Sequence, residues 1–203
     1  MKIGLFGGSF DPPHQGHRAL AESALDHLGL DELRWLPAGR PWQRQHRLAA
    51  AEDRRAMVAT AIADRAAFVL DDRELHRPGA SYTIDTACEL LAERPGAQLF
   101  LLIGEDQLQR LPTWHRWRAL IERVTLAVAY RGAMREPPAE LLAALQPEGR
   151  TIERLPMPPF DVSSTEIRAR LAAAHSAQAL APHLLAPQVA RYIDLHRLYA
   201  THP

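Results

Sequence analysis

The sequence has few cysteines and no long apolar stretches, and both absences exclude classes of protein. Its 203 residues include one cysteine, Cys88, which excludes an intramolecular disulfide or a thiolate metal cluster and indicates a reducing compartment, by default the cytoplasm. No stretch approaches about 18 uninterrupted apolar residues, and the first apolar run is far shorter than a signal peptide needs. We therefore expect neither a membrane span nor a leader.

An excess of charge of either sign is also missing. Lys plus Arg number 24 and Asp plus Glu number 24, so the formal net charge is zero and no nucleic-acid-binding footprint is expected, although a local basic pocket remains open. Lys2 is the only lysine, so an anion would mostly meet guanidinium groups, which suit bidentate phosphate contacts. GC-rich codons would give the same bias without any functional meaning.

Apolar periodicity predicts alternating strands and helices. The expected strands are Lys2–Gly7, Leu33–Pro37, Ala67–Leu70, Gln98–Gly104, Val124–Tyr130 and Thr151–Pro156. The expected helices between them are Gln15–Leu28, Ala51–Ala63, Thr83–Glu93, Trp114–Glu122 and Pro138–Leu145. This order is typical of an α/β fold with a doubly wound parallel sheet, in which ligands bind beyond the carboxyl ends of the strands.

The pattern changes after Pro159, where only helices are expected, over Ser164–His175 and Pro187–Leu198. We interpret the chain as one domain, 1–203, of which about 160–203 is a helical C-terminal extension. Some forty residues make a poor independent core, so its apolar positions are expected to pack on the sheet.

The strongest local signal follows the first strand and opens the first helix: Gly-Gly-Ser-Phe-Asp-Pro-Pro-His-Gln-Gly-His, residues 7–17. Paired glycines, Gly7 and Gly8, let a ligand approach the backbone closely. His14 and His17 are three residues apart, so with His17 in the first helical turn both imidazoles can face one point near the helix N-terminus. Free backbone N–H groups at that end attract anions, which predicts a phosphate site.

Other interpretations of this segment are possible. Two histidines could bind a metal, but only Asp11 stands nearby as a third ligand, so no metal site is predicted. The Gly-x-Gly-x-x-Gly dinucleotide fingerprint and the Gly-Lys-Ser/Thr end of a P-loop are both missing. A structural turn carrying two solvated histidines remains the simplest alternative.

A second helix start stands near the other end of the chain. Ser163 and Glu166 have the spacing of a capping box, so a helix is expected to begin here. The N–H groups, the hydroxyls of Ser164 and Thr165, and Arg168 one turn later would form a second anion site. Taken alone, an ordinary capped helix with a solvated arginine is the simpler interpretation.

Together the two segments carry a family resemblance. Residues 7–17 and Val162–Arg168 resemble the Gly-Gly-Ser-Phe-Asp-Pro-Pro-His-x-Gly-His and Ile-Ser-Ser-Thr-x-Ile-Arg motifs of the nucleotidyltransferase superfamily, with valine for the isoleucine. The resemblance implies a Rossmann-like fold and transfer of a nucleoside monophosphate from a triphosphate, with His14 and His17 as the catalytic residues. The ATP-binding residues it implies are Gly7, Gly8, Ser9, Phe10, His14, His17, Gly104, Asp106, Ser163, Ser164, Thr165 and Arg168.

Two further segments resemble one branch of that superfamily. Ser-Tyr-Thr-Ile-Asp-Thr at residues 81–86, and Gly104–Leu108 followed by Trp114, are similar to segments of the bacterial nicotinate-nucleotide adenylyltransferases. The resemblance implies that ATP and nicotinate mononucleotide are joined to give nicotinate adenine dinucleotide and pyrophosphate, with Mg²⁺ arriving on ATP. The mononucleotide-binding residues expected are Ser81, Tyr82, Thr83, Trp114, Arg44 and Arg131.

The chemistry of these residues fits that expectation. Thr83 at a helix start can hold a small carboxylate, Trp114 offers a flat face to a pyridine ring, and Asp106 after a strand can accept ribose hydroxyls. Each also has a plainer explanation: a helix cap for Ser81 or Thr83, a core position for Trp114, and a first-turn helix charge for Asp106.

The residues that hold the mononucleotide phosphate and the identity of the acceptor substrate have several candidates. Arg44, Arg47 and Arg131 are candidates for holding the mononucleotide phosphate, although Arg44 and Arg47 lie in a loop, where a solvated charge is the usual case. A related adenylyltransferase for nicotinamide mononucleotide or phosphopantetheine, and a non-catalytic nucleotide-binding regulator, remain the alternatives. No membrane or nucleic-acid partner is expected, and the sequence leaves the oligomeric state open.

Overall fold

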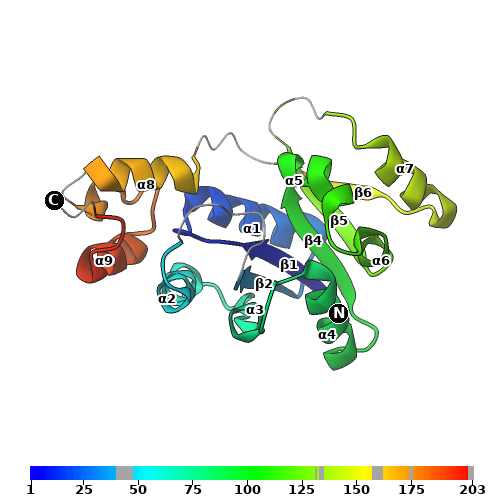
Figure 1. Cartoon of the computed structure of the whole chain (residues 1–203), viewed down its shortest axis with the longest axis horizontal. Helices are drawn as coiled ribbons and strands as arrows, with labels where there is room; N and C mark the ends of the chain where they lie inside the picture. The colour runs from blue at the N-terminus through cyan, green and yellow to red at the C-terminus, as the bar shows by residue number, and fades with distance from the viewer. Residues whose placement is uncertain (40–47, 131, 133–134, 157–161, 174–175, 201–203) are drawn as a thin grey trace.

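The computed structural model describes residues 1–39, 48–130, 132, 135–156, 162–173 and 176–200. Six parallel strands form one sheet in the order β3-β2-β1-β4-β5-β6 (Figure 1). Their bounds are β1 Lys2–Gly8, β2 Glu32–Pro37, β3 Phe68–Leu70, β4 Gln98–Gly104, β5 Val124–Tyr130 and β6 Ile152–Pro156. The predicted doubly wound, Rossmann-like sheet is confirmed.

The helices follow the predicted order with several differences. They are α1 Gln15–Leu28, α2 Ala51–Ile62, α3 Arg73–His76, α4 Thr83–Glu93, α5 Glu105–Arg110, α6 Trp117–Ile121, α7 Ala139–Leu145, α8 Ser164–Ala173 and α9 Pro187–His196. Short 3₁₀ turns lie at Leu111–Thr113, Gln146–Glu148 and Ala177–Leu180. The single-turn α3 and the short α5 were not predicted, because so few residues carry no helical period.

The helix expected from Trp114 starts three residues later. Trp114 closes the preceding 3₁₀ turn, with its N–H bonded to the carbonyl of Leu111 at 2.9 Å and ψ at an extended 148°. Arg116 then turns the chain through a left-handed conformation, φ 50°, before α6 begins at Trp117. The prediction for Trp114 was wrong because apolar spacing cannot distinguish a 3₁₀ turn followed by a helix from one longer helix.

Both faces of the sheet are covered, and alternate strand residues reach opposite layers. Leu5 and Leu101 belong to a buried cluster with α4, α6 and α7, whereas Phe6 and Leu102 belong to a cluster with α1 and α2. This alternation with period two explains why the central strands read as continuous apolar runs.

The order of the strands reverses between β1 and β4. β1 pairs with β2 as far as Gly8 beside Pro37, but its pairing with β4 ends at Leu5 beside Leu101. The two central strands therefore diverge at their carboxyl ends, which opens a crevice at the switch point of the sheet.

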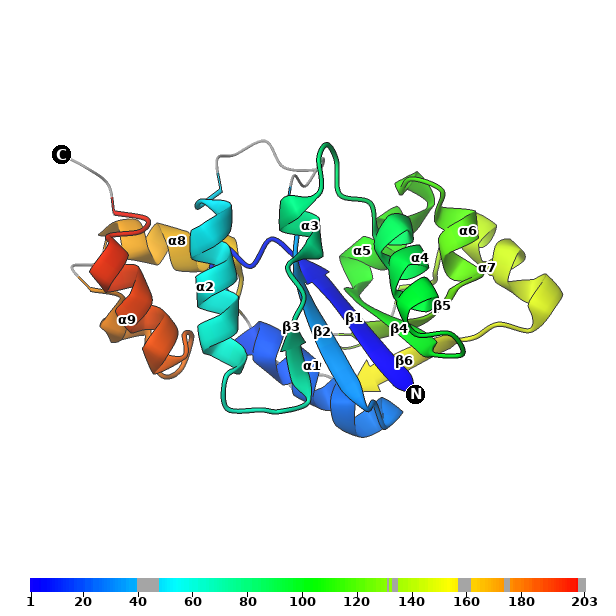
Figure 2. The ribbon, with the colours of Figure 1, turned by 90° about the horizontal axis from the view of Figure 1, so that it is seen from below.

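The C-terminal extension corrects one expectation. Its buried side chains, among them Ile167, Leu185 and Ile193, cluster with Met57 of α2, and no strand residue belongs to that cluster within the described part of the chain. Figure 2 shows α8 and α9 beside α2, away from the strands. The extension packs on α2 and not on the sheet, because α1 and α2 already occupy that face.

In the ranges that the structure covers, no helix combines the length and apolar character needed to cross a membrane.

Candidate active site

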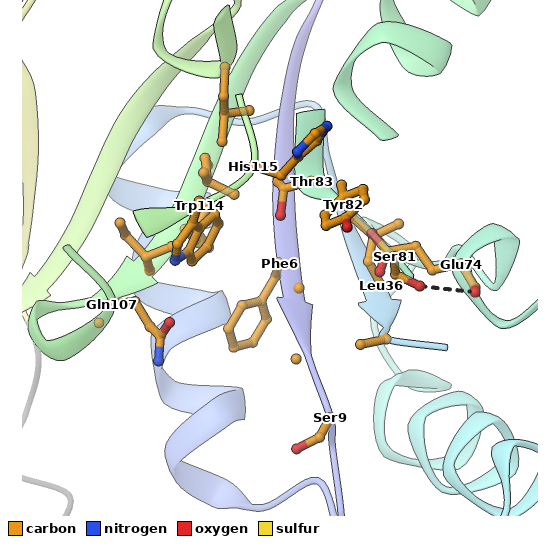
Figure 3. Close-up of a pocket in the computed structure, with 18 residues that line it drawn as sticks. Phe6, Ser9, Leu36, Glu74, Ser81, Tyr82, Thr83, Gln107, Trp114 and His115 are labelled. Carbon is orange, nitrogen blue, oxygen red and sulfur yellow. Dashed lines mark hydrogen bonds between the residues drawn. The ribbon is translucent and has the colours of Figure 1, made fainter. Parts of the chain in front are cut away.

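A pocket of about 260 Å³ occupies the crevice at the switch point (Figure 3). It is lined by residues from the ends of β1, β2 and β4, from α3, from the start of α4 and from the segment around Trp114. Eight predicted site residues line it: Gly7, Gly8, Ser9, Ser81, Tyr82, Thr83, Gly104 and Trp114. The structure therefore brings four of the predicted mononucleotide residues to the same place as the paired glycines.

The start of α4 presents backbone donors to this pocket. The first intrahelical bond runs from the N–H of Asp85 to the carbonyl of Tyr82 at 3.1 Å, so the N–H groups of Thr83 and Ile84 precede the helical ladder. No side chain at Tyr82 caps the helix, and Ser81 Oγ donates instead to the carbonyl of Glu74 at 3.3 Å. The alternative that Ser81 or Thr83 simply caps this helix therefore does not hold.

Trp114 and Tyr82 stand on opposite walls of the pocket (Figure 3). Trp114 is partly buried and packs against the core cluster of α4 and α6, as the core interpretation predicted. It also lines the pocket, so the stacking role stays a prediction. The imidazole of His115 stacks on Tyr82 with the ring centroids 4.2 Å apart. The pocket thus has aromatic rings on two sides, which suits a flat heterocycle.

The lining residues that were not predicted include Phe6, Glu74, Gln107 and His115. Glu74 is buried, and Thr86 Oγ1 donates to its Oε1 at 2.8 Å. Burial raises the pKa of Glu74 above its usual value, partly offset by the Thr86 hydrogen bond. The signal that could have found it was an acidic segment directly after a predicted strand; His115 carried no signal besides its place next to Trp114.

His14 and His17 form a reciprocal cap at the start of α1. The Nδ1 of His14 accepts the backbone N–H of His17 at 3.3 Å, and the Nδ1 of His17 accepts the N–H of His14 at 3.1 Å. Their rings stack with centroids 3.6 Å apart. Because each Nδ1 is an acceptor, each neutral ring carries its proton on Nε2 and can donate from that atom. The expected position of His17 in the first helical turn is confirmed.

An aromatic cluster connects this histidine pair to the pocket. The ring of His17 lies 5.9 Å from that of Phe6, which lines the pocket, and 5.1 Å from that of Phe10. The side chain of Phe10 is buried, and its backbone is in the left-handed region, with φ 47°. A non-glycine residue in this conformation is strained, so the surrounding packing holds the loop in place.

The start of α8 docks directly on the same loop. Ser163 Oγ accepts the N–H of Glu166 at 3.1 Å, the first half of the predicted capping box, while the Glu166 carboxylate pairs with Arg170. Ser164 Oγ donates to the carbonyl of Pro12 at 3.1 Å, and Arg168 Nη1 donates to the carbonyl of Asp11 at 2.7 Å. The two predicted anion sites are therefore neighbours, although Pro12 and Ser164 are 152 residues apart in sequence.

The missing side chain of Gly16 makes this docking possible. A Cβ on Gly16 would lie 3.0 Å from Val162 Cγ1 and 3.1 Å from His14 Nδ1. Only glycine lets the segment before α8 approach the histidine pair this closely.

Some predicted residues lie elsewhere. Asp106 is in the first turn of α5 with its side chain exposed and paired with Arg135, outside the pocket lining. Arg44, Arg47 and Arg131 lie outside the described residues. Thr165 is exposed and its Oγ1 accepts from Arg168.

Comparison with known proteins agrees with this geometry. The cytidylyltransferase-like family model matches residues 5–170, a span that includes the paired glycines, the histidine pair and the second helix start, so the chain is a nucleotidyltransferase. A Methylibium petroleiphilum protein named "Probable nicotinate-nucleotide adenylyltransferase" is 56% identical over 200 residues, covering 98% of this chain and 92% of that protein. A Bordetella pertussis protein of the same name is 46% identical over 199 residues, covering 98% of both. The chain belongs to the nicotinate-nucleotide adenylyltransferase family.

A solved structure supports the fold. The Plasmodium falciparum nicotinic acid mononucleotide adenylyltransferase complexed with NaAD superimposes with a TM-score of 0.79 at 18% identity, covering 98% of this chain and 97% of that one. At this identity the likeness concerns the fold alone, including the helical extension.

Proposed function

We propose that the protein joins nicotinate mononucleotide to ATP, giving nicotinate adenine dinucleotide and pyrophosphate. Membership of the family supports this activity. The structural observation that carries it is the pocket between Trp114 and the start of α4, which is also lined by Gly7 and Gly8 at the end of β1 and by Ser9 after it.

The reaction needs no nucleophilic side chain. An oxygen of the mononucleotide phosphate attacks the α-phosphorus of ATP, a new P–O bond forms, and the bond to the bridging oxygen breaks to release pyrophosphate. The protein has to align the two substrates and stabilise negative charge on the transferring group and on the leaving pyrophosphate. His14 and His17, as Nε2–H donors, would serve the transferring group.

The triphosphate end would lie at the start of α8. Ser163–Thr165 supply the N–H groups and hydroxyls of a helix N-terminus, and Arg168 adds a guanidinium. The hydrogen bond from Arg168 to the carbonyl of Asp11 orients that side chain beside the loop that holds the glycines.

The pyridine ring would stack on Trp114, and its carboxylate would accept hydrogen bonds at the start of α4. The N–H groups of Thr83 and Ile84 and the Thr83 hydroxyl are the donors there, and the helix dipole favours a negative group. Gly104 lines the pocket and remains a candidate for binding ATP, and Asp106 remains a candidate for contacts to ribose. Arg44 and Arg131 remain candidates for the mononucleotide phosphate.

Magnesium fits this site as a companion of ATP. Among the described residues no group of three or more His, Cys, Asp or Glu could hold a metal ion, so the phosphate oxygens and water would supply most ligands. The ion would neutralise charge on the triphosphate. The single cysteine supports a cytoplasmic location, which stays a prediction.

The test is pyrophosphate release from ATP with nicotinate or nicotinamide mononucleotide. The carboxylate of the acid accepts hydrogen bonds from the donors at the start of α4. The amide NH₂ group is itself a donor, so it would face those donors without forming a hydrogen bond. We expect kcat/KM to favour the acid by roughly 30- to 1000-fold. Equal values would show that the carboxylate site around Thr83 does not exist, and no release with either would refute the activity.

A further inference from the structure

Tyr199 reaches the catalytic loop from the far end of the chain. It follows α9, outside the residues 5–170 that the family model matches, and its hydroxyl donates to Asp11 Oδ1 at 2.7 Å across 188 residues. The backbone of Tyr199 is in the left-handed region, with φ 64°, a strained conformation for a non-glycine residue. Burial, followed by the charge of Asp11 and the hydrogen bond to it, raises the pKa of Tyr199, which keeps the hydroxyl protonated and donating.

Asp11 connects four segments of the chain. It is fully buried, and its Oδ1 also accepts the N–H of Ala49, just before α2, at 3.1 Å. Arg168 Nη1 lies 3.6 Å from Asp11 Oδ2 and donates to the Asp11 carbonyl. The loop after β1, the start of α2, the α8 arginine and the C-terminal segment therefore meet at one carboxylate.

A buried arginine next to this carboxylate fixes the loop on its other side. Arg54 donates to the carbonyls of Ser9 at 3.0 Å, Ala38 at 2.8 Å and Ala49 at 3.2 Å. Ser9 and Ala38 both line the pocket. Burial lowers the pKa of Arg54, and the charge of Asp11 opposes that shift.

The strained residue Phe10 lies between these anchors. Ser9 is held by Arg54 and Asp11 by Tyr199, so the left-handed turn at Phe10 persists because the residues on both sides of it are fixed. Three residues after Asp11 the chain reaches His14. A displacement of Asp11 would therefore displace both the histidine pair and Arg168.

We propose that Tyr199 is a positioning residue for adenylyl transfer: by holding the Asp11 carboxylate it keeps the loop before His14 and the Arg168 guanidinium in the geometry that the triphosphate requires. The proposal rests on the proposed function for the identity of the triphosphate. It assigns a role at the reaction site to the C-terminal segment, which contributes none of the described residues that line the pocket.

Tyr199→Phe is the test, and Tyr192→Phe is its matched control. Tyr192, on α9, donates to Asp53 Oδ1 on α2 at 3.0 Å, which is the same bond between the extension and the sheet domain but away from the catalytic loop. Each variant loses one tyrosine-to-aspartate hydrogen bond, and we expect the larger decrease in the urea denaturation midpoint for Tyr199→Phe, because Asp11 is fully buried. Only Tyr199→Phe should impair the reaction, with kcat/KM for ATP lower by about tenfold and KM for the mononucleotide within twofold of wild type.

If the two tyrosines only held the extension in place, both variants would lose kcat/KM for ATP by the same factor. That result would overturn the proposal. Retention of kcat/KM for ATP within twofold in Tyr199→Phe would overturn it as well. The ATP dissociation constant, measured by equilibrium dialysis without a second substrate, tests Tyr199 separately from the acceptor. We expect it to rise in Tyr199→Phe and not in Tyr192→Phe, even if wild type failed to use nicotinate mononucleotide and the proposed function were wrong.

Discussion

The imidazole rings of His14 and His17 stack 3.6 Å apart, and each Nδ1 accepts the backbone N–H of the other residue. The pair therefore serves as the cap of α1 as well as the predicted donor pair for the transferring phosphate. The two roles are compatible because the cap uses Nδ1 and the phosphate contact would use Nε2. Capping also fixes both rings before substrate arrives, which lowers the reorganisation needed in the transition state.

His17→Ala should lower kcat by about a hundredfold or more, because a donor to the transferring phosphate is lost. It should also lower the free energy of unfolding by about 1 kcal/mol, because the cap is lost. Pyrophosphate release and urea denaturation measure the two effects. His27→Ala, at the exposed end of the same helix, is the control and should change neither. Turnover near wild type in His17→Ala would exclude a catalytic role.

Arg168→Ala should raise KM for ATP by about tenfold and leave KM for the mononucleotide almost unchanged, because Arg168 is assigned to the triphosphate end. Arg170→Ala removes an exposed arginine of the same helix that pairs with Glu166, and should leave both constants unchanged. If the mononucleotide constant moved instead, the two substrates would bind in the opposite orientation.

Trp114→Ala should weaken nicotinate and nicotinamide mononucleotides by similar factors of about tenfold, because stacking reads the ring and not its substituent. Trp114→Phe keeps an aromatic face and should recover part of the loss. Inhibition constants for both mononucleotides provide the measurement. A loss confined to the acid would mean that Trp114 supports the carboxylate site instead of the ring.

Gly7→Ala separates ligand approach from folding. A Cβ on Gly7 meets no atom of the described structure within 4 Å, yet Gly7 lines the pocket. We expect unchanged thermal stability and a reduced kcat/KM for ATP, since the added methyl group would occupy space beside the substrate. Gly4→Ala is the opposite case: its Cβ would lie 2.7 Å from Leu30 Cδ1, so stability should fall. Full activity in Gly7→Ala would contradict the assignment of Gly7 to the ATP site.

Asp71 should make stability depend on acid pH. Burial alone would raise its pKa, but hydrogen bonds from Arg73 and Arg34 outweigh burial and hold the pKa below the ordinary 3.8. The folded state thus binds this proton less tightly than the unfolded state, so the stabilisation is complete above about pH 5 and is lost as pH falls below 3.8. Asp71→Asn should be about 3 kcal/mol less stable than wild type at pH 7, and the difference should shrink towards pH 3. A constant difference over that range would contradict the assignment.

The sequence by itself determined the elements whose signals are local. Six apolar runs marked six strands, and Thr83, Ser164 and Pro187 were placed correctly at helix starts, because start signals are set by neighbouring residues. The alternation of strands and helices then implied a parallel sheet with its site at the carboxyl ends. The motif residues followed from the same local order, since the glycine loop and α4 both come directly after strands or turns that the pattern marks.

Only the tertiary structure decided which distant residues meet. His115 stacks on Tyr82, the start of α8 docks on Pro12, and Tyr199 reaches Asp11 over 188 residues. The extension packs on α2, although its composition alone pointed to the sheet. Sequence periodicity states which face of an element is apolar, but it does not state which partner covers that face. That choice depends on the shapes and free surfaces left when all the other elements have packed.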